Sequence, residues 1–224
     1  MARGYTRGRG WTSSPCCYDL CHVLDEIVIL PFPSSRDLVP AVRRIRSGLL
    51  CSSIKSLRDH GYFDQYLAKL PQEHHARMLS LTAAEWIDPE LAFHHYEAVD
   101  RIGMTVDEQE RLGMQVAQHL QKGFLSVVLR LAIESGVTPW SVLERYQKLW
   151  ERYFDGSAIS VTKLGPKEAR AELVGFPLAR IGYVKAGVGG IMRGVTELVA
   201  KRVYVQRVAN LSSDTTLAYR LSWA

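Results

Sequence analysis

Residues 155–198, DGSAISVTKLGPKEARAELVGFPLARIGYVKAGVGGIMRGVTEL, decide the fold. After Asp155 the spacing of apolar residues changes from the helical period of about 3.6 to the strand period of about 2. Residues 157–163 and 168–174 both alternate in this way, so they predict a β-hairpin. Beyond Pro177 apolar residues recur at three- and four-residue steps, which predicts an amphipathic helix.

A second hairpin follows that helix. Residues 201–208 alternate again, and so do the residues from Leu217 to Trp223, with a polar turn at 210–214 between them. The C-terminal unit is therefore β-β-α-β-β, a four-stranded antiparallel sheet with one helix against it. The apolar stripe on that helix consists of Ile181, Val184, Val188, Ile191, Val195 and Leu198.

The preceding half of the chain has helical periodicity, so the fold class is α+β. Asp88-Pro89 and Thr138-Pro139 are typical helix starts, and Thr105 with Glu108 forms a capping box. Expected helices cover about 48–60, 62–69, 72–80, 89–101, 105–122, 124–133 and 138–154. Residues 124–133 are apolar nearly all round, which predicts a central buried helix.

Residues 1–47 mix Gly, Arg, Ser and Pro without a period, which predicts a disordered or poorly ordered tail before a single domain at 48–224. Met1 need not be the true start. The net charge of the chain is +5, and the tail with seven Arg against four acidic residues holds +3 of it. The remaining +2 is too small for a basic stripe, so we expect no nucleic-acid partner.

Cysteine and apolar patterns indicate the compartment. Cys16, Cys17 and Cys21 crowd the tail while Cys51 stands alone, so no disulfide framework spans the domain and a reducing cytoplasm is expected. The apolar run at 27–30 is too short for a secretion signal or a membrane span. The protein should therefore be soluble.

The order of elements, closing with Tyr219-Arg220-Leu221-Ser222-Trp223, resembles a known superfamily over about residues 105–223. That superfamily contains heme nitric-oxide-binding domains, vinyl-reductase-type ligand-binding domains and the trafficking subunits of TRAPP complexes. The stretch Leu164-Gly165-Pro166-Lys167-Glu168-Ala169-Arg170, with Gly175-Phe176-Pro177 and Trp223, is similar from about residue 48 to an uncharacterised paralogous family of myxobacterial proteins. The resemblance implies a pocket between helices and sheet, or a dimer surface, and no chemistry.

The cofactor is left unknown. Heme nitric-oxide-binding domains carry a Tyr-x-Ser-x-Arg motif for the heme propionates, and this sequence has no such motif. His119 shares the inner face of its expected helix with Leu112 and Val116, so it could ligate a cofactor iron, although a satisfied core histidine is the more common arrangement.

No metal site or catalytic constellation is expected. Adjacent histidines, as in His74-His75 and His94-His95, point about 100° apart on a helix and cannot converge on one ion, so solvated histidines are expected. The cluster of Cys16, Cys17, Cys21 and His22 has no matching second set of ligands. Ser52-Ser53-Ile54-Lys55 matches Ser-x-x-Lys without the partner motifs of that chemistry.

Two features remain as candidate binding surfaces. Gly187, Gly190 and Gly194 form a seam on the C-terminal helix, which predicts close packing on the sheet or on a second subunit. Aromatic residues could line a hydrophobic pocket, although at helical spacing they are more often core. The pocket candidates, with His119, are Tyr146, Trp150, Phe154, Phe176 and Tyr183.

Two functions fit these features. The first is a non-enzymatic ligand-binding or sensory module for a small hydrophobic ligand, in signalling. The second is a protein-interaction or scaffolding module that acts through a homodimer or partner surface. Enzyme activity ranks third, because no pair of titratable groups has assignable acid and base roles.

Overall fold

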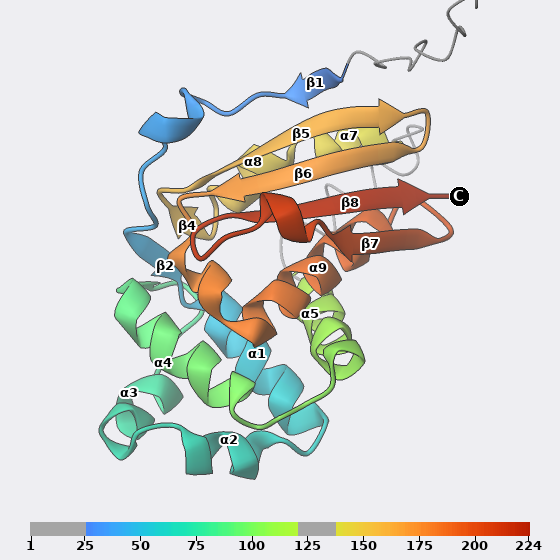
Figure 1. The fold of residues 1–224 in the computed structure, drawn as a ribbon. Helices are drawn as coiled ribbons and strands as arrows, with labels where there is room; N and C mark the ends of the chain where they lie inside the picture. Colours follow the sequence, from blue (N-terminus) through green and yellow to red (C-terminus); the bar gives the residue numbers. More distant parts are fainter. Residues whose placement is uncertain (1–25, 121–137) are drawn as a thin grey trace, which may run out of the picture.

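One antiparallel sheet forms the upper layer of the protein, and helices pack against one of its faces (Figure 1). The structure is a computed structural model, and it describes residues 26–120 and 138–224. The strand order is β1-β5-β6-β8-β7. The strands are β1 (Ile27–Leu30), β5 (Ala158–Gly165), β6 (Glu168–Val174), β7 (Val203–Arg207) and β8 (Leu217–Trp223).

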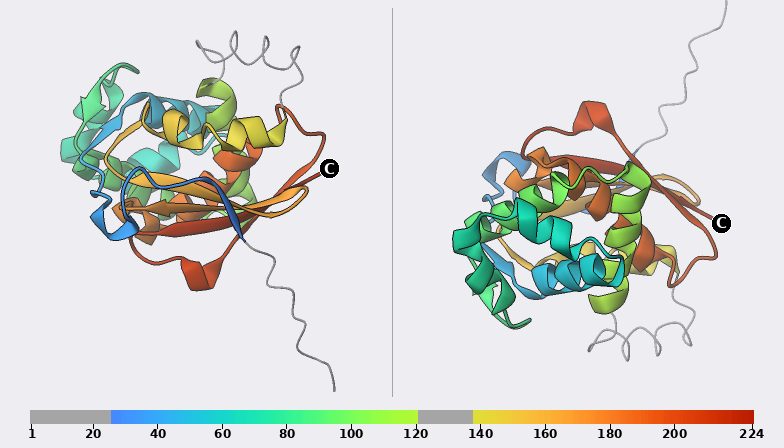
Figure 2. Two further views of the ribbon diagram at one scale, coloured as in Figure 1. Left: turned by 90° about the horizontal axis from the view of Figure 1, so that it is seen from above. Right: turned by 90° about the horizontal axis from the view of Figure 1, so that it is seen from below.

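Viewed from above and below, the helices gather on one side of this sheet (Figure 2). They are α1 (Gly48–Asp59), α2 (Phe63–Lys69), α3 (His75–Leu79), α4 (Pro89–Asp100), α5 (Val106–Leu120), α7 (Pro139–Leu143), α8 (Tyr146–Trp150) and α9 (Gly182–Thr196), with short 3-10 turns at Arg36–Leu38, Gln72–His74, Pro177–Arg180 and Ala209–Leu211. A small sheet of β3 (Trp86–Ile87), β2 (Arg44–Arg46) and β4 (Phe154–Asp155), in that order, joins the helical layer to the main sheet. None of the described helices is long and apolar enough to cross a membrane.

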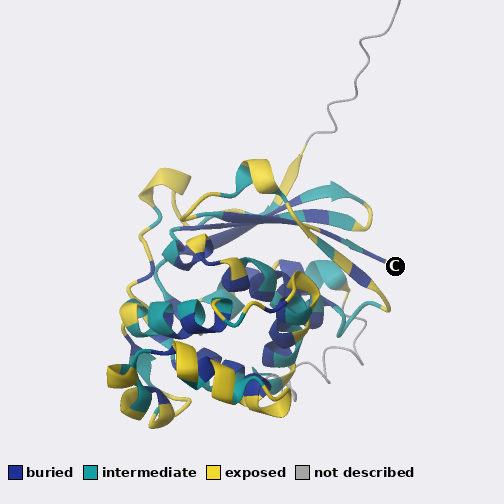
Figure 3. Cartoon of the chain, turned by 60° about the horizontal axis from the view of Figure 1, so that its bottom comes forward, coloured by how far each residue is buried: buried dark blue, intermediate teal, exposed yellow. Residues whose placement is uncertain are grey.

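The alternating pattern places the core on one face of the sheet. Val161 of β5 pairs with Ala171 of β6, which in turn pairs with Tyr219 of β8, and all three are buried. Successive residues of a strand point to opposite faces of the sheet, and paired residues share a face, so this row faces the helices while its neighbours in sequence face away. Buried residues accordingly run along the strands and along the inner sides of the helices (Figure 3). The expected α+β class is confirmed.

The sheet has five strands rather than four, because part of the expected tail joins it. Ile27–Leu30 forms β1 and pairs with the edge of β5, and Glu26 is bound to Arg170 of β6 by two hydrogen bonds of 2.8 and 2.7 Å. Residues 44–46 form β2, with Ile45 fully buried. The boundary at residue 48 is therefore wrong for residues 26–47, because a short apolar run needs only a free strand edge to pair with. Residues 1–25 lie outside the described part of the chain.

The expected aromatic helix over 138–154 is also divided. It forms α7 and α8, and its last residue, Phe154, belongs to β4. Thr138 caps α7 by accepting from the Ser141 amide at 3.4 Å. The helix expected at 124–133 lies outside the described residues. Helices α1, α2, α4 and α5 match their expected ranges, and the Thr105–Glu108 capping box forms.

Backbone-to-backbone packing holds α9 against α5. A Cβ added at Gly190 would overlap the Glu110 carbonyl oxygen and lie 3.0 Å from the Met114 amide nitrogen. A Cβ added at Gly113 of α5 would likewise overlap the Gly187 carbonyl. Such contact is possible only where both helices lack side chains. The seam predicted from the glycines is therefore used inside the chain, against α5 rather than against the sheet or a second subunit.

A chain of hydrogen bonds crosses the helical layer. His95 of α4 is 0% exposed, its Nδ1 lies 2.9 Å from the Tyr66 hydroxyl of α2, and its Nε2 lies 3.0 Å from the Ser53 hydroxyl of α1. The Ser53 hydroxyl lies 3.5 Å from that of Tyr183 on α9. Burial lowers the pKa of His95 to about 3, so the imidazole is neutral at physiological pH. This chain ties four helices together around one end of the core.

The seam predicts opposite responses at two neighbouring glycines. Gly190→Ala should lower the free energy of unfolding by about 3 kcal/mol, because overlap with the α5 backbone outweighs a gain of about 1 kcal/mol in helix propensity. Gly187→Ala is the matched control, since the nearest atom to its added Cβ is Tyr183 Cε1 at 4.0 Å. That variant should be neutral or stabilised by up to about 1 kcal/mol. Urea unfolding measures both, and equal effects would contradict the assignment of the seam to α5.

His95 predicts a loss of stability in acid. The unfolded chain binds a proton near pH 6.5 and the folded chain only near pH 3, so falling pH favours unfolding by about 1.4 kcal/mol per unit between these values. Between pH 7.5 and 5 the native protein should therefore lose about 2 kcal/mol more than His95→Gln, which cannot titrate. Urea unfolding at both pH values measures this difference. The other histidines contribute equally to the pH dependence of both proteins, so their contributions cancel. Parallel losses in the two proteins would show that His95 does not control acid stability.

Candidate ligand-binding cavity

A cavity of about 480 Å³ lies between the helices and the sheet. Its walls come from α1, α4, α5, α7, α8, α9 and β5, together with Phe154, Phe176 and Leu178. Most of the described lining residues are aliphatic or aromatic. Typical binding pockets occupy about 300–1,000 Å³ and are mostly apolar with a few polar groups, so this cavity has the size and character of one.

The structure brings together five of the six pocket residues predicted from the sequence. Tyr146, Trp150, Phe154, Phe176 and Tyr183 all line this cavity. Trp150 stacks on Phe154 at 4.0 Å between ring centroids, and Phe176 meets the edges of both at 5.2 and 5.3 Å. Such aromatic packing forms a rigid wall. A role for these residues in binding stays a prediction.

His119 is not on the cavity wall. Its Nδ1 lies 3.4 Å from the Ser56 hydroxyl and its Nε2 lies 3.7 Å from Asp59, both on α1. The imidazole therefore faces the crevice between α5 and α1. The apolar stripe of α5 correctly predicted that His119 faces inward. The side chain contacts another helix, α1, and not the cavity.

Three hydroxyl groups interrupt the apolar wall at one end. Ser53, Tyr96 and Tyr183 line the cavity there, and Tyr183 continues the hydrogen-bonded chain to His95. Burial raises the pKa of both tyrosines, so they remain neutral phenols. Sequence reasoning missed Ser53, Tyr96 and His95, because they come from α1 and α4 and no local pattern links them to α9.

The contact between Ser53 and His95 has the geometry of a nucleophile and its base, but not the electrostatics. A general base works best with a pKa near the working pH, and burial holds the pKa of His95 at about 3. The group on its other nitrogen is the neutral phenol of Tyr66 rather than a carboxylate. Lys55, whose partner in the Ser-x-x-Lys pattern is Ser52 and not Ser53, pairs with Asp59 at 2.8 Å on the surface. The arrangement therefore positions Ser53 rather than activating it.

The adjacent histidines have separate environments. His95 is buried, so the expectation of solvated histidines is wrong for it, because the face of α4 that carries it packs against α1 and α2. His94 instead stacks on His74 at 4.0 Å between ring centroids, and His75 contacts the Leu70 carbonyl at 3.0 Å. Among the described residues no group of His, Cys, Asp and Glu side chains is placed to hold a metal ion. Cys16, Cys17, Cys21 and His22 lie outside those residues.

Positively charged side chains stand at the rim of the cavity. Arg145, Lys148 and Arg152 are exposed and also count among its lining residues. Long basic side chains cover apolar surface with their stems while their charged ends stay in water. These three residues therefore add apolar wall without placing a charge inside the cavity.

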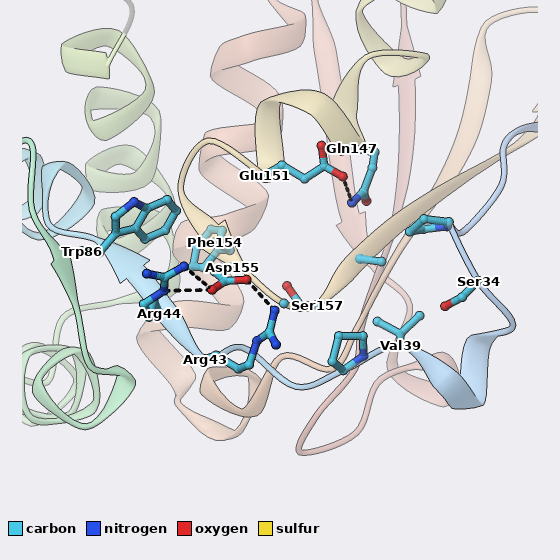
Figure 4. A pocket seen from close by; sticks show the side chains of 14 residues that line it. Ser34, Val39, Arg43, Arg44, Trp86, Gln147, Glu151, Phe154, Asp155 and Ser157 are labelled. Carbon is cyan, nitrogen blue, oxygen red and sulfur yellow. Dashed lines mark hydrogen bonds and ion pairs between the residues drawn. The ribbon is translucent and has the colours of Figure 1, made fainter.

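A second concavity, of about 410 Å³, lies on the surface beside β2 and β4 (Figure 4). Arg43 and Arg44 both point at Asp155 there, each with a nitrogen 2.8 Å from a carboxylate oxygen. Gln147 donates to Glu151 at 2.8 Å on the opposite wall. The charged groups of this groove are thus bonded to one another or to Gln147.

The cavity residues do not fit heme, which the resemblance to heme nitric-oxide-binding domains raised. Heme iron is held by an imidazole, a thiolate, a phenolate or a methionine paired with a histidine. No described residue lining the cavity is His or Cys, and residues 121–137 contain neither in their sequence. The lining tyrosines have raised pKa values, which disfavours the phenolate. Met192 lines the cavity without a histidine partner there.

No family model and no curated protein sequence matches the chain. Solved structures of H-NOX proteins, however, match its fold. An H-NOX from T. tengcongensis has 15% identity and a TM-score of 0.57, covering 80% of this chain and 97% of that chain. An oxygen complex of an oxygen-binding H-NOX domain related to soluble guanylate cyclases has 15% identity and a TM-score of 0.55, covering 80% and 95%.

A third match comes from a different organism. An H-NOX protein from S. oneidensis, in the Fe(II) ligation state, has 12% identity and a TM-score of 0.55 over 79% of this chain and 95% of that chain. The matches extend over nearly the whole length of these proteins. Because the sequence identities are low, the matches establish the fold alone. The chain has the H-NOX fold, which agrees with the fold that the order of its elements indicated.

Proposed function

We propose that this protein is a binding module that takes a small, mostly apolar molecule into the cavity between its helices and its sheet. The observation that carries the proposal is the cavity itself, whose described walls are dominated by aliphatic and aromatic side chains. Burying apolar ligand surface there releases about 25 cal/mol per Å². The cavity volume of about 480 Å³ would admit a molecule of the size of a medium-chain lipid or a small terpenoid.

The H-NOX fold supports this proposal by analogy only. The similar structures include heme-containing and oxygen-binding proteins, whereas the described cavity residues of this chain include no axial ligand for heme iron. The ligand proposed here is therefore an organic molecule held by apolar contact. Helices α5, α8 and α9 all contribute to the cavity wall. A bound ligand would therefore stabilise the arrangement of these three helices, and that change would give the protein a sensory role.

The alternative of a scaffolding module loses its main support. It was based on the glycine seam, and the seam glycines contact α5 within the same chain. Binding in the cavity is the function that the described geometry favours.

A neutral fluorescent probe tests the proposal. N-phenyl-1-naphthylamine should bind the purified full chain with enhanced fluorescence. Leu149→Trp, at a half-buried lining position, should weaken that binding at least about tenfold because the indole fills cavity volume. Titration of the fluorescence measures both affinities.

Glu144→Trp is the matched control, because Glu144 is exposed on the same segment and does not line the cavity. It adds the same indole and should bind the probe like the native protein. Circular dichroism checks that both variants fold. If Leu149→Trp leaves the affinity for the probe unchanged, the probe binds outside the cavity and the proposal is wrong.

The misfit to heme gives a separate expectation. The purified protein incubated with hemin and dithionite should show no Soret band of an imidazole-ligated heme, and nitric oxide should produce only the spectrum of free heme. Absorption spectra check this. A nitric-oxide-sensitive Soret band that Leu149→Trp abolishes would instead place heme in the cavity.

A further inference from the structure

The hydroxyl groups of Ser53, Tyr96 and Tyr183 form a polar patch on the cavity wall. Ser53 and Tyr183 are buried, and their oxygens lie 3.5 Å apart. The Tyr96 and Tyr183 rings stack at 6.1 Å between centroids, so the two phenols lie side by side. Within the described residues the Tyr96 hydroxyl has no hydrogen-bond partner, and that of Tyr183 has only Ser53. An otherwise apolar cavity therefore has one end with unused hydrogen-bonding capacity.

His95 sets the direction of the hydrogen bonds behind this patch. A neutral imidazole donates from one nitrogen and accepts at the other. The Tyr66 hydroxyl is 0% exposed, and in the described part of the chain its only partner is His95 Nδ1. If Nδ1 donated, the Tyr66 hydrogen would be buried without an acceptor, at a cost of about 1–3 kcal/mol. Tyr66 therefore donates to Nδ1, and the Nε2 hydrogen points at Ser53.

The Ser53 oxygen thus accepts from His95, which leaves its own hydrogen directed away from the imidazole. That hydrogen can point to Tyr183 or into the cavity. If Ser53 donates to Tyr183, the Tyr183 hydrogen is free to point into the cavity, as is that of Tyr96. In each arrangement the patch presents hydrogen-bond donors to a ligand.

We propose that this patch binds the carbonyl oxygen of an otherwise apolar ligand, such as a ketone, quinone or lactone. The inference rests on the proposed function of the cavity and specifies its ligand class. A carbonyl oxygen accepts two hydrogen bonds and donates none, which matches converging phenol and serine donors.

A buried carboxylate fits the same place poorly. No Lys or Arg comes from α1, α4 or α9 to the described wall around the patch. The charged side chain that contacts the Tyr183 backbone is Asp100, whose Oδ1 accepts from the Tyr183 amide at 2.6 Å. An anion placed there would be desolvated without a cationic partner among these helices, whereas a neutral carbonyl needs only donors.

Two probes of equal shape test the patch by displacement of N-phenyl-1-naphthylamine from the full chain. They are 2-octanone and 2-methyl-1-octene, in which a CH2 group replaces the carbonyl oxygen. Tyr183→Phe should weaken binding of 2-octanone about tenfold, because the carbonyl is then buried with a missing donor. Binding of the alkene should stay within about twofold, since apolar contact is unchanged. Tyr96→Phe is an independent second variant with the same expected pattern.

Tyr219→Phe is the control. Tyr219 is a buried tyrosine outside the cavity lining whose hydroxyl donates to the Lys185 carbonyl at 2.6 Å, so its removal should leave the affinity ratio of the two probes as in the native protein. Infrared spectra of carbonyl-labelled 2-octanone add a second readout. The carbonyl stretch should move to lower wavenumber on binding, and Tyr183→Phe should reverse part of that shift.

The outcomes separate this inference from the proposed function. If the fluorophore binds in the cavity and the ketone and alkene respond alike to Tyr183→Phe and Tyr96→Phe, the polar patch does not bind a carbonyl and the inference is overturned. If the fluorophore itself does not bind, the proposed function fails first. Selective weakening of the ketone in both variants supports the inference.

Discussion

The direct contact between the backbones of α5 and α9 is the constraint on which the rest of the structure depends. Gly113 on α5 and Gly190 on α9 leave no room for a Cβ, so the two helices meet along their main chains. On its other side α9 presents Gly189 to the Tyr219 ring, where an added Cβ would lie 3.3 Å from Cε1. Helix α9 is thus held between α5 and the sheet, and its position determines where space remains.

That space is the cavity, and α9 contributes to its wall from Tyr183 to Val195. Gly187 serves both surfaces, because its carbonyl contacts Gly113 while its missing side chain leaves the cavity wall open. A helix with ordinary side chains at these positions would stand farther from α5. The close packing of α9 on α5 therefore fixes the position of a helix that also lines the cavity.

The buried polar chain gives the cavity its polarity. Tyr66, His95 and Ser53 satisfy one another, so the polar groups behind the wall lose little by burial. The neutrality of His95 follows from that burial, and it explains why the Ser53–His95 contact orients a hydroxyl rather than creating a nucleophile. The same fold that holds heme in other proteins here surrounds a cavity whose polar groups are neutral hydroxyls. Proteins with the same fold can thus differ in the chemistry of the site, because that chemistry depends on the individual residues that line it.

The sequence by itself determined the elements whose signals are local. The change of period after Asp155, the capping box at Thr105 and the proline-led start of α4 depend on neighbouring residues, and the structure has these elements where they were expected. The aromatic pocket residues were also predictable, since a conspicuous stripe of Tyr, Trp and Phe has to pack somewhere. Their meeting around one cavity brings α8 and α9 together with Phe154 of β4 and with Phe176.

Only the tertiary structure decided the features that join distant segments. Ile27–Leu30 became a strand because β5 offered a free edge, and no signal in that short run could show it. The glycine seam could have faced the sheet, another subunit or another helix until α5 was placed against it. Ser53, His95 and Tyr183 are far apart in sequence, and their hydrogen bonds exist because α1, α4 and α9 converge. Periodicity reports which face of an element is buried, but the partner of that face depends on the packing of the whole chain.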